Sequence, residues 1–381
     1  MKKIAIIGAG ISGLFIANLF KKNSNYQIKI YEKNKSINLD EGYGIQLSVN
    51  SIKLLNEIGF DRLRKDEKFT PDKINFYSNK SFNKICELNI SDFNSDDYKY
   101  TTLKRSVLIN FLKKDLGNEI KNGCNLSKID QQDHKILLSF ENDEIDECDY
   151  LIISDGVFSK SKSILSNNQV KPRYNDTLAI RGSLSRIHDD IDNKNISLFL
   201  GSNFHQVIYP VNSFGDLNFI AIMKYHLSNL EKKNHSLFND KVFIQKVLGK
   251  IPIKNKEFID DLKELKIFPV FVSDNFYRFR NNHIHLIGDA FFAFPPSFAQ
   301  GASQSIEGAY ELFKSIKNNT EGNFFKNRVN KTKMVNIRSK INQFVFHLSN
   351  PLITFIRNIF LKRLVKNRKF LESYLGKIYK N

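Results

Sequence analysis

The residues near the amino terminus that are best suited to chemistry are three glycines and one acid. Gly8, Gly10 and Gly13 stand in the run GAGISG, and Glu32 follows at the end of a later apolar run. In this spacing the first glycine permits a tight turn, the second lets the backbone approach a pyrophosphate, and the third lets a helix pack closely on a strand. A carboxylate at Glu32 can accept hydrogen bonds from ribose hydroxyls, which argues against a ribose 2′-phosphate. The pattern predicts a dinucleotide-binding turn.

The residues around this turn predict the elements that hold it. Residues 4–7 are a short β-branched run, residues 14–20 have helical periodicity, and residues 27–31 form a second strand-like run. Strand, glycine turn, helix, strand and acid is the order of a βαβ unit, whose helix amides face the phosphates. The lysines at positions 2 and 3 also suggest a signal peptide, but the apolar run after them is short and closes with glycines. We assign to cofactor binding Gly8, Gly10, Ile11, Ser12, Gly13, Glu32 and Lys33.

Two further acids follow strand-like runs much later in the chain. Residues 150–154 end at Asp155, and residues 285–287 lead into Asp289. An aspartate at the carboxyl end of a strand can reach a ribityl chain. A helix expected over residues 303–316 can present its start to a reduced flavin ring, which carries negative charge. Each feature alone can be an ordinary strand end and turn, but the three together favour FAD over NAD. They assign to the flavin Asp155, Asp289, Gln300, Gly301 and Ala302.

The composition describes a globular chain with a substantial core. Of 381 residues, 41% are hydrophobic, 12% aromatic and 26% charged, which excludes a disordered chain, a collagen and a coiled-coil rod. No apolar run reaches the roughly 18 residues of a membrane-spanning helix. Cys86, Cys124 and Cys148 have the spacing of neither a disulfide framework nor a zinc site. We therefore expect no metal and a reducing, cytoplasmic location.

Positive charge gathers at the carboxy-terminal end. The net charge is +18, and residues 323–381 hold 14 Lys/Arg and one acid, Glu372. A basic amphipathic helix can lie on an anionic membrane as a peripheral contact. The alternative is a helix packed on the nucleotide-binding domain with its apolar stripe in the core. We see no basic-aromatic recognition motif and expect no nucleic-acid partner. The residues at helical spacing are Leu352, Phe355, Ile356, Ile359, Phe360, Leu364 and Val365.

Several further segments carry a resemblance to a known family. They are residues 42–50, 102–108, 205–211 and 347–352, together with the pair Arg357-Asn358. With the three motifs above, the chain resembles the single-component FAD-dependent aromatic hydroxylases over nearly its whole length. The resemblance is greatest to the salicylate-hydroxylase-like branch, and para-hydroxybenzoate and ubiquinone-pathway hydroxylases are related. It adds Gln46, Arg105 and Leu126 to the expected FAD site.

The chain departs from the family pattern at five positions. The usual histidine after Gly-Asp-Ala-Ala is Phe292, and the usual glycine before Gln-Gly is Ala299. An arginine near Asp155 is replaced by Lys162, which keeps the charge without the bidentate geometry. Ser303 and Gly308 replace an asparagine and an aspartate. We expect the flavin cradle to survive, because its contacts are mostly made by backbone.

The resemblance implies an α/β fold: a Rossmann-like FAD-binding domain with an inserted mixed-sheet substrate domain and a C-terminal helical tail. We place the FAD-binding domain at residues 1–75, 100–165 and 280–345. The substrate domain takes residues 76–99 and 166–279, with strands expected at 177–184, 206–210 and 219–223. The basic tail covers residues 346–381.

The resemblance also implies the chemistry. NADH or NADPH, bound transiently, reduces FAD, O2 adds to give a flavin C4a-hydroperoxide, and oxygen passes to a phenolic or hydroxybenzoate-like ring. Deprotonating a phenol needs a group with a pKa near 7, so His205 is the catalytic candidate. Tyr209 lies four residues on and therefore on the same face of a strand. A structural histidine and a core tyrosine are the alternative. Arg181 and Pro296 are candidate substrate contacts, and Arg181 can equally form a structural salt bridge.

Two other enzyme functions remain open on the same fold. One is a ubiquinone-pathway-type hydroxylase acting on a membrane-held polyprenylated phenol. The other is a flavin dehydrogenase or reductase that uses no O2. A tryptophan-dependent flavin halogenase is excluded, because the chain contains no tryptophan.

Overall fold

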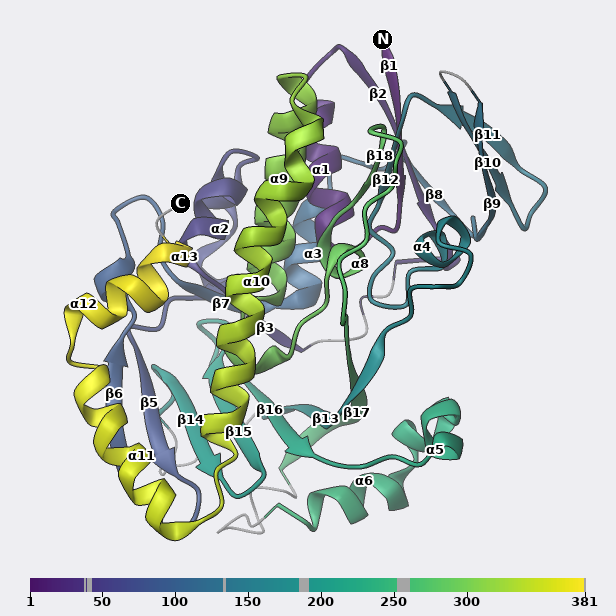
Figure 1. Cartoon of the computed structure of the whole chain (residues 1–381). Coiled ribbons are helices and arrows are strands. Elements are labelled where there is room, and N and C mark those ends of the chain that lie inside the picture. Colours follow the sequence, from purple (N-terminus) through teal and green to yellow (C-terminus); the bar gives the residue numbers. More distant parts are fainter. Residues whose placement is uncertain (38, 40–42, 133–134, 185–191, 252–260, 380–381) are drawn as a thin grey trace.

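The computed structural model describes residues 1–37, 39, 43–132, 135–184, 192–251 and 261–379. Two large sheets lie one above the other in Figure 1, and long helices near the carboxy terminus run beside both. Residues 40–42, which include the start of the predicted segment 42–50, lie outside the described residues.

The first large sheet is entirely parallel and holds the amino-terminal βαβ unit. Its strand order is β18-β12-β1-β2-β8. Ile4 and Ile6 of β1 face a core shared with several helices, whereas Ala5 and Ile7 face the opposite core. This period-2 alternation is what a strand buried on both faces requires. The bounds are β1 Lys2–Ile7, β2 Tyr26–Glu32, β8 Ile120–Asn122, β12 Tyr150–Ile153 and β18 Ile284–Leu286.

Helices cover one face of this sheet and a small sheet covers the other. On the first face α1 packs against α3 and α9, whereas the second face packs on an antiparallel sheet of order β11-β10-β9. The predicted strands and helices of the flavin motifs are confirmed within two residues at each end, except that α1 starts three residues before the predicted helix. The bounds are α1 Ile11–Lys21, α3 Arg105–Lys113, α9 Gly301–Lys317, β9 Leu126–Gln132, β10 Lys135–Phe140 and β11 Ile145–Cys148.

The second large sheet is mixed and has the order β17-β13-β16-β15-β14-β5-β6. One face packs on α6 and on the 3-10 turn His235–Asn239, and the other faces the carboxy-terminal helices. The three predicted strands lie within β13, β15 and β16, which confirms the α/β fold class. The bounds are β5 Lys73–Ser78, β6 Lys84–Asn89, β13 Arg173–Leu184, β14 Ile196–Gly201, β15 Phe204–Pro210, β16 Leu217–Lys224, β17 Leu262–Val272, α5 Asn229–Lys233 and α6 Lys241–Leu248.

Short elements connect the two large sheets. A small sheet of order β3-β7-β4 lies between them, and β3 leads directly into α2. The division into two domains stays a prediction, and one of its boundaries, at residue 75, falls inside β5. The bounds are β3 Gly44–Leu47, β4 Lys68–Phe69, β7 Thr101–Lys104, α2 Val49–Asn56, α4 Lys160–Leu165 and α8 Gly288–Phe291, with short 3-10 turns at Phe60–Arg62, Lys65–Glu67, Ser91–Phe93, His235–Asn239 and Pro296–Phe298.

The tail is helical, as predicted. It runs along the outer edge of the mixed sheet beside β5 and β6 before its end approaches α2 (Figure 1). Its apolar residues do not form one buried stripe: Leu364 and Val365 are half-buried, whereas the other five in the predicted stripe are exposed. The alternative of a stripe packed wholly in the core is therefore wrong. The bounds are α10 Glu321–Phe346, α11 Pro351–Leu364, α12 Arg368–Leu371, a π-helical turn Glu372–Gly376 and α13 Lys377–Tyr379.

Candidate active site

The glycine turn has the geometry that its spacing predicts. Gly8 has φ +100°, and a Cβ there would lie 2.7 Å from the Ser154 carbonyl oxygen. A Cβ on Gly13 would lie 2.2 Å from the Gly8 carbonyl oxygen, so the helix approaches the strand as closely as the backbone allows. At Gly10, by contrast, no described residue apart from its two chain neighbours has an atom within 4 Å of the position of a Cβ. The open side of the turn is therefore the side that a pyrophosphate would occupy.

The acid at the end of β2 meets this turn. Glu32 accepts hydrogen bonds from the backbone N–H of Ala9 at 3.0 Å and of Asn34 at 3.0 Å. It thus holds the turn from the side and stands beside the position of a ribose. Of the other predicted contacts nearby, Ser12 is buried, Ile11 is half-buried at the start of α1, and Lys33 is exposed.

The two later aspartates flank a buried lysine. Asp155 accepts from the backbone N–H and the hydroxyl of Ser161, at 3.0 and 2.8 Å, through Oδ2. Its Oδ1 is buried and has no hydrogen-bond partner among the described residues. Lys162, 4% exposed, donates to the Ala290 carbonyl at 2.9 Å. Burial lowers the pKa of Lys162, and the charges of Asp155 and Asp289 act in the opposite direction. An unsatisfied buried carboxylate oxygen fits a site whose cofactor brings the missing donor.

Asp289 itself faces the cavity described below. Its side chain is open to that cavity, yet the dense protein around it raises its pKa to about 6, with Lys162 acting in the opposite direction. Burial of this kind disfavours the charged carboxylate. A hydroxyl donor from a ribityl chain would stabilise the carboxylate, so the residue fits the predicted cofactor.

The start of α9 is open where a flavin ring would lie. Among the described residues no side chain caps the helix, and none outside the helix start has an atom within 4 Å of a Cβ built on Gly301. The first-turn amides of an uncapped helix are unsatisfied donors at the positive end of the dipole. Ala299, which replaces the family glycine, has φ +51° and so adopts a left-handed conformation that favours glycine. Gly301 and Ala302 both line the cavity.

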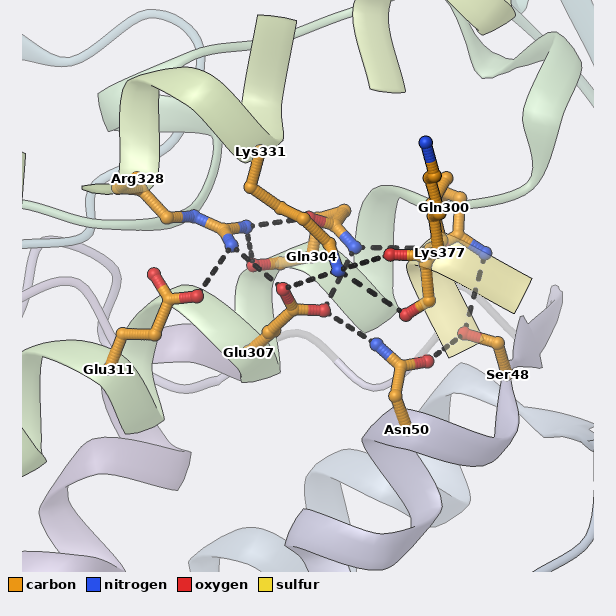
Figure 2. A network of polar contacts seen from close by, with 10 residues as sticks. Ser48, Asn50, Gln300, Gln304, Glu307, Glu311, Arg328, Lys331 and Lys377 are labelled. Atoms are coloured by element: carbon orange, nitrogen blue, oxygen red, sulfur yellow. Dashed lines mark hydrogen bonds and ion pairs between the residues drawn. The ribbon is translucent and has the colours of Figure 1, made fainter. Parts of the chain in front are cut away.

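The side chain of Gln300, a predicted cofactor contact, is held by other residues of the protein. Its side chain is 1% exposed and enters a buried polar network, where it donates to Ser48 at 3.3 Å and accepts from Gln304 at 3.2 Å. Figure 2 shows this network at the junction of α2, α9, α10 and the carboxy-terminal turn. The side chain of Gln300 therefore braces the helix start, and only its backbone is left for the cofactor.

Glu307 is the centre of this network. Its carboxylate accepts from Asn50 at 2.6 Å and forms ion pairs with Arg328 at 3.3 Å and Lys331 at 3.4 Å (Figure 2). Lys331 also donates to the backbone carbonyl of Lys377 at 3.1 Å. The buried ion pair between Glu307 and Lys331 thus joins α9 to α13 at the end of the described tail. Arg328 also explains the family departure at Gly308, where a Cβ would lie 2.8 Å from the Arg328 Nε.

A cavity of about 670 Å³ connects the flavin motifs with the mixed sheet. Asp289, Gly301 and Ala302 lie in one part of its wall, and His205, Tyr209 and Arg181 lie in another. Pro296 belongs to the same wall. The carboxy-terminal helices complete it with mostly apolar side chains, including Leu361, Leu364, Leu371 and Leu375.

The polar groups of the cavity cluster around Gln46. Gln46 accepts a hydrogen bond from the Tyr100 hydroxyl at 2.7 Å and is also hydrogen-bonded to Tyr209. Burial raises the pKa of Tyr209, while the Arg181 charge and the Gln46 hydrogen bond act in the opposite direction. The guanidinium of Arg181 lies 5.8 Å from the ring centre of Tyr43 and 6.0 Å from that of Phe268. A neutral phenol, an amide and a cation therefore share one side of an apolar chamber.

His205 and Tyr209 line the same cavity, as their spacing on β15 predicts. His205 Nδ1 lies 2.8 Å from His347 Nε2, at the end of α10. Burial, and secondarily His347, hold the pKa of His205 well below 6.5. The prediction of a pKa near 7 is therefore wrong, because water is excluded from the imidazole and its neighbour is another imidazole rather than a carboxylate.

The remaining predicted residues lie away from this cavity. Arg105 starts α3, where its backbone N–H donates to the Tyr43 carbonyl at 2.8 Å. The Leu126 side chain is buried in the core against the parallel sheet, so only its backbone could meet a cofactor. Phe292, at the position of the family histidine, stacks on Phe276 with ring centres 4.3 Å apart. That position is a core contact in this chain.

The sequence interpretation missed the aromatic residues that the tail adds to the cavity. Tyr374 and Tyr379 line it, and Tyr379 is 6% exposed. Tyr100, directly before the strand β7, was also missed. Their neighbours in the sequence carry no motif, and only the alternation of apolar and basic residues in the tail could have suggested a buried side.

The glycine turn on a parallel sheet, the two acids at strand ends and the open helix start define a flavoprotein of the FAD-binding class. A family model described as "FAD binding domain" matches residues 1–327. The chain belongs to this family and is an FAD-dependent oxidoreductase of the monooxygenase class.

Individual relatives are distant in sequence and similar in fold. The chain is 22% identical to 6-hydroxynicotinate 3-monooxygenase of Pseudomonas fluorescens, over 83% of this chain and 82% of that protein. It is 22% identical to salicylate hydroxylase of Pseudomonas putida, over 82% and 77%. Among solved structures, Klebsiella pneumoniae HpxO complexed with FAD and uric acid superposes with a TM-score of 0.84 at 17% identity, covering 98% of this chain and 97% of that one. A salicylate hydroxylase substrate complex gives 0.77 at 18% identity, covering 100% and 95%.

Proposed function

We propose that the protein hydroxylates a phenolic or hydroxybenzoate-like aromatic compound, using NADH or NADPH and O2. The observation that supports this most directly is the shared cavity: the open start of α9 and Asp289 lie in the same chamber as Tyr209, His205 and Arg181. A flavin held by the first group would face an aromatic ring held by the second. The balanced reaction consumes one NAD(P)H, one proton and one O2, and yields the hydroxylated ring, NAD(P)+ and water.

Bound FAD would supply the oxygen-activating chemistry, and the chain would hold it. The open face at Gly10 and the acid Glu32 suit the pyrophosphate and a ribose. Asp155 and Asp289 suit hydroxyl donors along the linking chain. The amides at Gly301 and Ala302 suit the electron-rich edge of the ring, because the helix dipole favours negative charge there.

We assign the aromatic substrate to Tyr209 and His205. A neutral Tyr209 donates or accepts a hydrogen bond at the substrate hydroxyl, and Gln46 sets the orientation of its phenol group. Neutral His205 is a hydrogen-bond partner rather than a strong base, because its pKa lies well below 6.5. Arg181 favours an anionic form of the substrate, whether phenolate or carboxylate.

The apolar lining serves the same reaction by excluding water. Water in the chamber would release reduced oxygen species without hydroxylation. His205→Gln and Tyr209→Phe remove the proposed hydrogen bonds to the substrate without touching the FAD site. Both variants should therefore leave FAD bound while oxygen consumption becomes uncoupled from product formation. Unchanged coupling in both variants would remove these residues from the proposal.

The test of the function is anaerobic bleaching of the flavin absorbance in the purified protein. NADH and NADPH are added in turn, with and without a panel of hydroxybenzoates and other phenols. A phenol that accelerates bleaching, and then consumes O2 with formation of a hydroxylated product, supports the hydroxylase. Electron transfer to an artificial acceptor with no substrate-linked O2 consumption would instead support the dehydrogenase function.

A further inference from the structure

Helix α11 is apolar on two opposite sides. Leu361 and Leu364 line the cavity on its inner side. The outer side is open: Leu352 is 75% exposed, Phe355 65% and Phe360 57%. In Figure 1 the helix lies at the outer edge of the molecule beside β6, with no described element covering it from outside. Ile353, Ile356 and Ile359 are exposed on the same helix.

Such a helix is not typical of a free protein surface. A surface helix normally buries one apolar stripe and turns its polar face to water. Contiguous exposed apolar side chains, by contrast, mark a surface that binds something. The outer side of α11 therefore needs an occupant.

The charges around this side favour one occupant. Lys362, Arg363, Lys366, Arg368 and Lys369 are all exposed, and no acid occurs between Pro351 and Leu371. The remaining cation of the segment, Arg357, is 8% exposed and bonds to Asn358 and the Val345 carbonyl. Apolar side chains flanked by cations match the interface of an anionic bilayer, where each Lys or Arg near the surface adds attraction.

We propose that α11 docks the protein on the surface of an anionic phospholipid bilayer. The apolar residues on the outer side enter the acyl boundary while the five exposed cations contact lipid phosphates. None of the helices in the described ranges is long and apolar enough to cross a membrane, so the contact is peripheral. A second copy of the chain is a poorer occupant, because a twofold contact through α11 would bring the same five cations together.

The docking also suggests a class of substrate, a step that rests on the proposed function. One side of α11 would touch lipid while the other side forms the cavity wall. The wall that the carboxy-terminal helices give this cavity is mostly apolar, which suits an apolar substituent on the ring. The substrate would then be an aromatic compound with an apolar substituent, taken from the bilayer.

The experiment is vesicle flotation of the full-length, FAD-loaded protein. Vesicles of phosphatidylcholine alone are compared with vesicles containing phosphatidylglycerol, at low and at raised salt. We expect flotation only with the anionic vesicles and less of it at raised salt. The triple variant Lys362→Glu, Arg363→Glu and Lys366→Glu should bind at least tenfold more weakly, and so should Phe355→Ser with Phe360→Ser.

Matched controls carry the same changes elsewhere on the surface. Lys80→Glu, Lys171→Glu and Lys263→Glu change the net charge equally at three exposed lysines, and Phe214→Ser removes a ring that is 71% exposed. These variants should float like the unchanged protein. Equal losses in the control and α11 variants would overturn the proposal, as would no flotation with anionic vesicles at low salt. A dimer in sedimentation that only the α11 variants abolish would assign the surface to a second copy.

The outcomes separate docking from catalysis. Flotation requires neither reductant nor substrate, so a protein that floats but never consumes O2 supports the docking and contradicts the proposed function. If the substrate class is right, an alkyl-substituted phenol in anionic vesicles should accelerate flavin bleaching more than the same phenol without its alkyl chain. Equal rates would contradict the substrate class alone.

Discussion

At the scale of single residues, Asp289 tests the flavin cradle most directly. Asp289→Ala should weaken FAD binding about tenfold or more, because hydrogen bonds to a charged group contribute about 1.5–3 kcal/mol. The measurement is the dissociation constant from titrating apoprotein with FAD. Asp274→Ala, which removes a surface ion pair to Arg173, is the matched control and should bind FAD normally. Full affinity in Asp289→Ala would mean that the second flavin acid is misassigned.

The pair His205 and His347 predicts a dependence of stability on pH. Burial lowers both pKa values, that of His347 to about 4, so folded imidazoles stay neutral where unfolded ones become charged. The unfolded state therefore binds more protons below about pH 6.5, and the free energy of unfolding falls from there toward pH 4. Each imidazole contributes up to about 1.4 kcal/mol per pH unit. In urea unfolding between pH 7 and 5, the free energy of unfolding of His347→Gln should fall less steeply than that of the unchanged protein. An equal slope would show that the histidine pair does not cause this pH dependence.

Ala299 carries backbone strain that its family glycine would not. A left-handed conformation costs a residue with a side chain roughly 1–2 kcal/mol, which glycine avoids. Glycine also makes the unfolded chain more flexible, which offsets about 0.4–1 kcal/mol of this gain. Ala299→Gly should therefore raise the free energy of unfolding by about 0.5–1 kcal/mol, measured by urea titration with FAD in excess. The same change at Ala309, fully buried inside α9, should destabilise the protein.

At the scale of elements, the Glu307 network joins α2, α9, α10 and the tail. Glu307→Ala leaves Lys331 as a buried cation without its carboxylate and leaves Arg328 with only Glu311, at 3.5 Å, and breaking a buried pair typically costs about 3–5 kcal/mol. Thermal unfolding of the FAD-bound protein measures this. Glu57→Ala removes an exposed carboxylate that accepts from Tyr310, and it should change stability by no more than about 0.5 kcal/mol. Equal effects of the two substitutions would show that the network adds little.

At the scale of the whole molecule, the tail closes the chamber. Ile378 is fully buried and packs with Val335 and Phe346, so Ile378→Ala should cost about 2–5 kcal/mol and release the tail more readily than the rest of the fold. Trypsin should then cut first among the tail cations while the flavin stays bound. Leu352→Ala, at an exposed position of α11, should leave the cleavage rate unchanged.

The sequence predicts local features of this molecule better than distant contacts. The glycine turn, the strand ends at Asp155 and Asp289 and the shared face of His205 and Tyr209 follow from spacing within one or two elements. The His205–His347 contact joins residues 142 positions apart, and no sequence motif indicates it. The prediction of a pKa near 7 for His205 was wrong for the same reason, because the tail and the mixed sheet together bury this side chain. The network that holds the Gln300 side chain was not foreseen either, because Ser48 lies 252 positions away in the sequence.

The strand order also determines when parts of this fold can form during synthesis on the ribosome. Strand β1 is made before its neighbour β12 and before β18, which pairs with β12, and the cavity wall is complete only after Tyr379. At about 5–20 residues per second, synthesis of the remaining chain takes some tens of seconds. The mixed sheet is complete only at Val272, and synthesis from there to Tyr379 takes roughly 5–20 s, during which the face that later meets the tail has no cover. A nascent chain interrupted before α10 would thus present an exposed apolar surface to chaperones.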